Sequence, residues 1–185
     1  MRLFLAIELP DDVRRHLAEL QDNWRERCAH APGKISWTRP ENFHITLRFF
    51  GEVAEPQVPL LTSALQSAPF GAPIHLRAHS SECFPPRGNI RVITAAMNGD
   101  LERLSRLYDE LTKVCDPLGY PAERRPYRPH VTIGRPRSPL PSPFRATFAD
   151  PSLFPGPTFD ATQFTLFQSQ LRSGGSQYVP LARFP

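Results

Sequence analysis

Hydrophobic residues recur with two different periods along this chain, and each change of period marks a predicted element. Over residues 3–7 every second residue, Leu3, Leu5 and Ile7, contributes to one apolar face, which predicts a strand. After Asp11 the apolar residues recur about once per helical turn, which predicts an amphipathic helix that ends near His30. The helical spacing returns behind Asp100 and predicts another helix, with Gly119 as its cap.

Shorter apolar runs between proline- and glycine-rich turns predict the remaining elements. We expect a helix at 58–65 and strands at 35–38, 43–50, 74–84, 89–97, 131–133, 163–169 and 177–184. The proline-rich stretch 136–160 is expected to be mostly loop, with one strand at 144–148. Helices outside antiparallel sheets give an α+β fold. Because no linker separates parts of different composition, residues 1–185 are expected to form a single domain.

One four-residue pattern occurs twice. Residues 44–47 (His-Ile-Thr-Leu) and 130–133 (His-Val-Thr-Ile) both read histidine, aliphatic, threonine, aliphatic. In a strand, the histidine and threonine of each copy share one face, while the two aliphatics point into the core. A proline lies four residues before each histidine, and a predicted strand and helix precede each copy. We interpret the chain as two duplicated halves, related by an approximate two-fold axis that brings both His-x-Thr faces to one cleft.

Composition narrows the class of protein. The three cysteines are widely spaced and form no Cys-x-x-Cys, which indicates neither a disulfide framework nor a zinc site. No apolar stretch is long enough to span a membrane, and the chain begins with a strand pattern rather than a signal peptide, so we expect a cytoplasmic protein. The net charge of +4 fits an anionic partner without identifying one. Only two of the 22 basic residues are lysines, and we attribute the excess of arginine first to codon bias. The alternative explanation, that guanidinium groups suit phosphate, applies only to the arginines near the motifs.

Two histidines and two threonines in one cleft predict phosphodiester chemistry without a metal or other cofactor. Unperturbed histidine titrates near pH 6.5, so one imidazole can accept a proton from a nucleophile while the other donates one to a leaving group. Threonine hydroxyls donate hydrogen bonds to phosphate oxygens, and arginine balances the phosphate charge. No cluster of acidic ligands accompanies the motifs. Either motif alone is more often structural, but two matching copies favour a catalytic pair.

Other candidate residues have plainer explanations. The remaining histidines are expected to face solvent or to lack a third metal ligand: His16, His30, His75 and His79. The arginines near the second motif either solubilise a loop or face RNA, and the sequence leaves both possibilities open: Arg124, Arg125, Arg128 and Arg137. Phe49 and Phe50 are expected to lie in the core rather than to stack on a base.

The chain resembles the bacterial and archaeal RNA 2′,3′-cyclic phosphodiesterases, once called 2′-5′ RNA ligases, of the two-histidine (2H) phosphoesterase superfamily. The resemblance is carried by residues 2–10 at the opening, 40–52 around the first motif and 125–135 around the second. It implies a bilobal, pseudo-symmetric fold whose antiparallel sheets line a central cleft. It also implies metal-free opening of a terminal RNA 2′,3′-cyclic phosphate to a 2′-phosphate.

The resemblance also implies roles for individual residues. It makes His44 the proton donor and His130 the proton acceptor, although the symmetry of the motifs alone does not say which is which. Thr46 and Thr132 are implied to bind the phosphate. Arg135 is a further phosphate contact, and the glycine before it and the proline after it are expected to end the strand and turn it towards the cleft.

The implied partners are RNA ends bearing a 2′,3′-cyclic phosphate, or cyclic nucleotides, and we expect a monomer. Thr94 stands where relatives often carry tryptophan, so base stacking at this position is in doubt. Two other functions remain open. A 5′-hydroxyl RNA end in place of water gives 2′-5′ ligation with the same residues, and a protein that has lost its chemistry only binds RNA ends.

Overall fold

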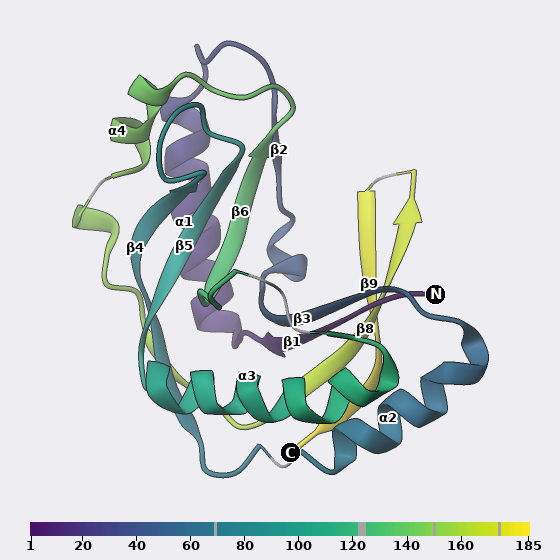
Figure 1. Cartoon of the computed structure of the whole chain (residues 1–185). Coiled ribbons are helices and arrows are strands. Elements are labelled where there is room, and N and C mark those ends of the chain that lie inside the picture. The colour runs from purple at the N-terminus through teal and green to yellow at the C-terminus, as the bar shows by residue number, and fades with distance from the viewer. Residues whose placement is uncertain (69, 122–124, 150, 174) are drawn as a thin grey trace.

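The computed structural model describes residues 1–68, 70–121, 125–149, 151–173 and 175–185, and its elements are labelled in Figure 1. Its strands are β1 (Arg2–Glu8), β2 (Ile35–Trp37), β3 (His44–Glu52), β4 (Ile74–Phe84), β5 (Val92–Gly99), β6 (His130–Pro136), β7 (Thr158–Ala161), β8 (Phe164–Arg172) and β9 (Gly175–Phe184). Its α-helices are α1 (Asp11–Arg27), α2 (Val58–Gln66), α3 (Leu101–Cys115) and α4 (Arg145–Phe148). The fold is α+β, as predicted.

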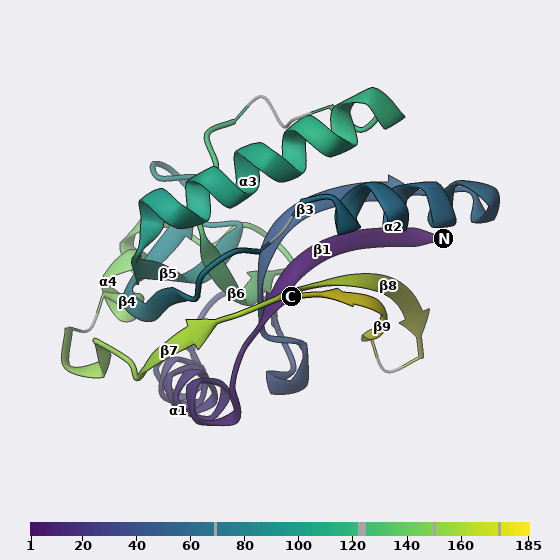
Figure 2. The ribbon, with the colours of Figure 1, turned by 90° about the horizontal axis from the view of Figure 1, so that it is seen from below.

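The strands form one sheet with the order β7-β4-β5-β6-β3-β1-β8-β9, and β2 pairs with β6 outside this path. The two motif strands, β3 and β6, are neighbours at the centre, and all pairs are antiparallel. On either side of this centre lie β1 and β5, the strands that begin the two predicted halves. The sheet curls strongly, so that β1, β3 and β8 bend together in Figure 2. We propose that residues 1–185 form one domain built from two such halves.

The helix of each half forms a hydrogen bond to the motif strand of the other half. The helix α1 follows β1, but its buried Gln21 donates from Nε2 to the carbonyl oxygens of Thr38 (2.7 Å) and of Ile133 on β6 (3.0 Å). The helix α3 follows β5, but its Thr112 hydroxyl accepts a hydrogen bond from the buried Arg48 of β3 at 2.8 Å. Each motif strand is therefore held by the helix of the opposite half.

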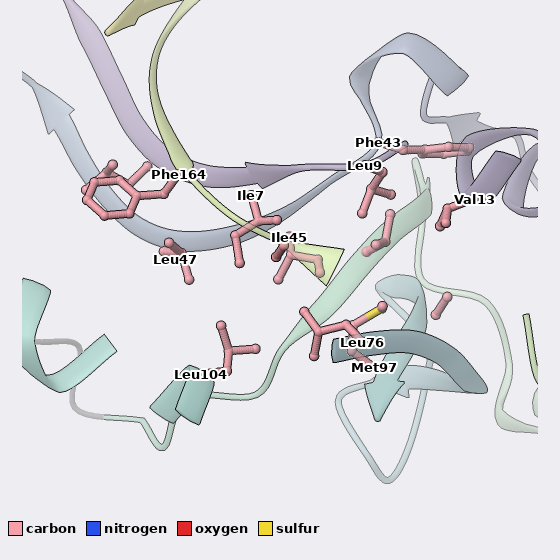
Figure 3. Close-up of a cluster of buried hydrophobic side chains, with 14 of the residues drawn as sticks. Ile7, Leu9, Val13, Phe43, Ile45, Leu47, Leu76, Met97, Leu104 and Phe164 are labelled. Atoms are coloured by element: carbon pink, nitrogen blue, oxygen red, sulfur yellow. The ribbon is translucent and has the colours of Figure 1, made fainter. Parts of the chain in front are cut away.

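The aliphatic residues of both motifs enter a common core, as predicted. Ile45, Leu47, Val131 and Ile133 are at most 2% exposed. Figure 3 shows Ile45 and Leu47 among apolar side chains from other strands and from α3. Full burial of one such side chain contributes about 1.5–3 kcal/mol, so the motif strands are anchored through these faces.

A β-bulge interrupts the second motif strand directly after its threonine. Thr94 of β5 pairs with Thr132, but the preceding residue of β5 pairs with Gly134, so Ile133 is left without a partner. Ile133 and Gly134 are both buried, and the alternation then resumes one residue out of phase. Arg135 consequently returns to the face of the motif threonine. The strand ends at Pro136, one of the two residues expected to end it, but Gly134 lies within the strand, and the bulge rather than the strand end re-aims the arginine.

The first motif strand carries a bulge at the same place. Ala6 of β1 pairs with Thr46 and the preceding residue of β1 pairs with Arg48, which leaves Leu47 without a partner. Phe49 therefore occupies the position that corresponds to Arg135, and it is 56% exposed. The prediction that Phe49 lies in the core is wrong, because the bulge reverses its face.

The strand predicted at 144–148 is also wrong. This segment forms a 3₁₀ turn over Ser142–Phe144 followed by α4. Its two phenylalanines lie four residues apart, the spacing of one helical turn, and Phe148 packs edge-on against Trp24 of α1 with ring centroids 5.4 Å apart. The short strand β7 lies inside the stretch that was predicted to be loop.

The bulge in β6 depends on a residue without a side chain. A Cβ atom on Gly134 would lie 2.9 Å from the Trp37 ring and 3.1 Å from Ile35 of β2. We expect Gly134→Ala to lower the free energy of unfolding by about 1–3 kcal/mol, as overpacking of a core does, measured by urea denaturation. The loss should be smaller in a Trp37→Leu background, where the ring has been removed. Equal losses in both backgrounds would show that the indole does not impose the glycine.

Candidate active site

The two motifs meet where β3 and β6 pair through Ile45 and Val131. One step along this antiparallel register in either direction sets His44 opposite Thr132 and Thr46 opposite His130. All four side chains are partly exposed on the face opposite the buried aliphatics. The structure thus brings the four motif residues together at the centre of the sheet.

Both histidines are oriented by the same backbone contact. His44 donates from Nδ1 to the carbonyl oxygen of Asn42, and His130 donates from Nδ1 to that of Arg128, each at 2.7 Å. A carbonyl only accepts, so each Nδ1 carries the proton and each Nε2 is free to exchange one. The Nε2 of His44 lies 3.0 Å from the hydroxyl of Thr46, which can donate to it.

His44 is enclosed by aromatic side chains. Phe4 lies 5.0 Å away between ring centroids, and Tyr178 meets the imidazole edge-on at 5.3 Å. Tyr178 comes from β9, three strands from β3 in the sheet order, and the curl of the sheet brings it over the site. Asn42 also donates from Nδ2 to the carbonyl oxygen of Ser176 at 2.8 Å, which ties β9 to the first motif.

Enclosure changes the acid–base character of His44. The pKa of His44 is lowered to about 4, chiefly by burial; the hydrogen bond to Asn42 opposes this shift, and the charge of His130 adds a smaller lowering. At pH 7 His44 is therefore neutral before any ligand binds. Neither Tyr178 nor Phe4 was singled out by sequence analysis, because only the pairing of distant strands places these rings beside His44: β1 pairs with β3, and β9 reaches the site through β8.

His130 lies at a more open position. It lines a cleft of about 830 Å³ together with Thr46 and Arg135. Its nearest ring is Phe84, with centroids 5.6 Å apart. His44 instead lines a smaller pocket of about 140 Å³ with Tyr178, so the two motif histidines face different surroundings.

The cleft has a rigid aromatic wall. Tyr127 stacks on Tyr108 with ring centroids 4.4 Å apart and an interplanar angle of 10°. Its hydroxyl donates to the carbonyl oxygen of Thr46 at 3.2 Å, and burial raises the pKa of Tyr127 far above its usual value. This tyrosine therefore stays protonated and braces the first motif strand from the second half.

The arginines near the second motif divide into two groups. Arg125 and Arg128 line the cleft, whereas the backbone amide of Arg137 donates to the carbonyl oxygen of Lys34 outside it. Arg124 lies outside the described residues. Thr94 is fully buried and donates its hydroxyl to the carbonyl oxygen of Glu82, so it presents no surface to a base.

Other titratable side chains among the described residues form no cluster that resembles a second site. His75 pairs with Asp160 on the surface, and His16 is partly buried rather than solvent-facing, as its Nε2 is enclosed without a hydrogen-bond partner. The three cysteines, Cys28, Cys83 and Cys115, are free. Within the described residues no three histidine, cysteine or acidic side chains gather as metal ligands, and none of the helices described is long and apolar enough to cross a membrane.

Comparison with known proteins identifies similar sequences and folds. A model of the LigT-like phosphoesterase family matches residues 7–94 and 97–178. The RNA 2′,3′-cyclic phosphodiesterase of Thermus thermophilus is 32% identical over 100% of this chain and 89% of its own length. The enzyme of the same name from Escherichia coli is 28% identical over 99% and 95%.

Solved structures agree with these sequence matches. The crystal structure of the protein TT0787 of Thermus thermophilus superposes with a TM-score of 0.81 at 30% identity, covering 100% of this chain and 97% of that one. Escherichia coli LigT complexed with 3′-AMP superposes with a TM-score of 0.73 at 25% identity, covering 99% and 96%.

The enclosure of His44 by Tyr178 makes a testable prediction. We expect Tyr178→Leu to raise the pKa of His44 from about 4 towards its usual value, because water regains access to the imidazolium. NMR titration of the His44 ring protons measures this shift directly. Tyr178→Phe keeps the ring and serves as the matched control, with no change expected. An unchanged pKa in Tyr178→Leu would mean that the tyrosine does not desolvate His44.

Proposed function

Because the chain belongs to the LigT-like phosphoesterase family and is a phosphoric diester hydrolase, we propose that it opens the terminal 2′,3′-cyclic phosphate of RNA, or of a cyclic nucleotide, to a 2′-phosphomonoester without a metal ion. One observation carries this proposal most strongly. The imidazoles of His44 and His130 are held by identical backbone contacts on adjacent strands, each with Nε2 free to exchange a proton. Such a pair supplies both proton transfers of a phosphodiester cleavage.

The proposed reaction divides the two proton transfers between the histidines. His130, on the open cleft, accepts a proton from water as the water attacks phosphorus. His44 donates a proton to the 3′ oxygen as that oxygen leaves. In-line attack requires the base and the acid on opposite sides of the phosphorus, and an approximate two-fold axis between the motif strands favours that arrangement.

Threonines and an arginine would hold the phosphate between the histidines. The hydroxyls of Thr46 and Thr132 lie on the same face as the imidazoles and can donate to the non-bridging oxygens. Arg135, which the bulge aims towards the cleft, adds a guanidinium for the same anion. These contacts strengthen as charge accumulates on the phosphate in the transition state.

A donor role for His44 requires that the substrate itself raises its pKa. One negative charge about 4 Å from an imidazolium stabilises it by about 4 kcal/mol at an effective dielectric constant of about 20. That energy is enough to raise a pKa of about 4 to near neutrality. The bound phosphate would therefore favour protonation of His44, and His44 would then donate this proton to the leaving oxygen.

The same residues would support 2′-5′ ligation if a 5′-hydroxyl replaced water. We favour hydrolysis, because water is in great excess over RNA ends in dilute solution. A protein that only binds RNA ends is a weaker alternative, since both motifs retain their histidine and threonine. A turnover measurement separates this last hypothesis from the others.

We expect hydrolysis of a 2′,3′-cyclic nucleotide to persist in EDTA, because the histidines supply both proton transfers. In the same assay His44→Ala and His130→Ala should each lower kcat by roughly 10²- to 10⁴-fold. The double variant should be hardly slower than either single variant, because the two residues act in one step. His30→Ala, at an exposed position outside the site, is the control. Loss of activity on chelation, restored by one divalent metal, would contradict the mechanism, as would fully additive losses.

The orientation of the substrate makes a separate prediction. With the 3′ oxygen as the leaving group beside His44, the product of a cyclic-phosphate RNA should carry a 2′-phosphate and a free 3′-hydroxyl. Chromatography of the digest against authentic 2′- and 3′-phosphate standards measures this ratio. A predominantly 3′-phosphate product would mean that the ring is held the other way round, and the roles of the histidines would have to be reassigned.

A further inference from the structure

The cleft beside His130 extends well beyond the motif residues. Its volume of about 830 Å³ lies near the upper end of the roughly 300–1,000 Å³ that ligand pockets occupy. From Thr46 and His130 its lining continues along residues 125–128 and across to the turn between β4 and β5, at Pro85 and Arg91. A cyclic phosphate held between the two motifs would occupy only one end of this space.

Beyond the motif residues, the described lining of the cleft carries positive charge and no negative charge. Arg91, Arg125 and Arg128 line the cleft together with Arg135, which is already assigned to the cyclic phosphate, and all four are exposed. The described lining contains no carboxylate, and no described residue forms an ion pair with any of these guanidinium groups.

Several arginines outside the cleft, by contrast, form ion pairs with carboxylates. Salt bridges join Arg25 to Asp22 on α1 and Arg183 to Glu8 between strands. A run of guanidinium groups that form no ion pair with the described residues, inside a concave surface, is suited to an anion with more than one charge, such as the backbone of a nucleic acid strand.

Aromatic side chains are interleaved with these arginines. Phe49, exposed by the bulge in β3, lies in the cleft with Phe84 and the stacked pair of Tyr108 and Tyr127. Channels that bind single-stranded nucleic acid combine a basic track for phosphates with aromatic faces for bases. The cleft therefore offers surfaces for both parts of a nucleotide.

We propose that this cleft is a subsite for the nucleotide upstream of the cyclic phosphate, in which Arg91 and Arg128 bind the internal phosphodiester. This inference rests on the proposed function and names its substrate class: single-stranded RNA ends of two or more nucleotides, in preference to a free cyclic mononucleotide. Specificity arises from backbone charge and base stacking, so the subsite is tolerant of base sequence.

The experiment compares three substrates: 2′,3′-cyclic AMP, the dinucleotide ApA ending in a 2′,3′-cyclic phosphate, and the same dinucleotide with an uncharged methylphosphonate linkage. We expect kcat/KM of the wild-type protein to be at least about tenfold higher for the charged dinucleotide than for cyclic AMP, the size of one charge-assisted hydrogen bond. The methylphosphonate should lose most of this advantage. The preference should also weaken as salt concentration rises.

Variants assign the effect to the arginines. Arg91→Gln and Arg128→Gln should each reduce the ratio of kcat/KM for the charged dinucleotide to that for cyclic AMP by about tenfold. Neither variant should change the ratio of kcat/KM for the methylphosphonate dinucleotide to that for cyclic AMP, because the methylphosphonate linkage carries no charge for an arginine to bind. Arg87→Gln, in the exposed turn before Arg91 and absent from the cleft lining, is the matched control and should preserve the wild-type preference.

Binding gives a readout that does not depend on turnover. Calorimetric titration with ApA carrying a 2′-phosphate should show tighter binding than titration with 2′-AMP, and Arg91→Gln and Arg128→Gln should remove the difference. Equal affinities, or a difference that both variants retain, would overturn the upstream subsite. Absence of hydrolysis with the binding difference intact would instead count against the proposed function alone.

Discussion

The pairing of β3 with β6 positions everything else in the site. These strands meet through Ile45 and Val131, both fully buried. In each strand the aliphatic residues that anchor it alternate with the histidine and threonine that face outward. Buried aliphatic residues contribute about 1.5–3 kcal/mol each, so they fix the register of the two strands. That register in turn sets the distance between the two imidazoles. No direct polar contact between the histidines is needed to hold them in register.

A symmetric centre with asymmetric edges explains how two equivalent motifs acquire different chemistry. Both histidines donate from Nδ1 to a carbonyl two residues earlier, as duplicated halves would. The hairpin of β8 and β9, however, brings Tyr178 over His44, whereas His130 opens into the larger cleft. Enclosure lowers the pKa of His44. The local sequences of the two motifs are too similar to account for this enclosure.

The two β-bulges determine which further side chains reach the face of the motif histidines. Each follows a motif threonine and shifts the alternation by one residue, so that Arg135 and Phe49 reach the face from which strict alternation would exclude them. One half thereby contributes a cation and the other an aromatic ring. A bulge changes the direction of side chains without changing composition, so it places an additional side chain on the face of the candidate catalytic residues.

The sequence by itself determined the types of most elements and the catalytic candidates. Hydrophobic periods of two and 3.6 depend on residues close together in the chain, so β1, α1, α2, α3 and both motif strands were predictable. The repeated motif also predicted which side chains face the core and which face the site. At 144–148 the same signal was ambiguous, because phenylalanines four residues apart fit a helical turn while the surrounding prolines suggested loop and strand.

Only the tertiary structure decided how distant segments meet. The bulges appear only when β3 and β6 are paired with β1 and β5, and the enclosure of His44 requires a residue from β9 more than a hundred positions away. Strand register, solvent exclusion and the resulting pKa depend on contacts between residues far apart in sequence, which no local pattern records. The sequence determined which residues are candidates for the chemistry, and the folded sheet decided which way they face, how exposed they are and how the surroundings of the two histidines differ.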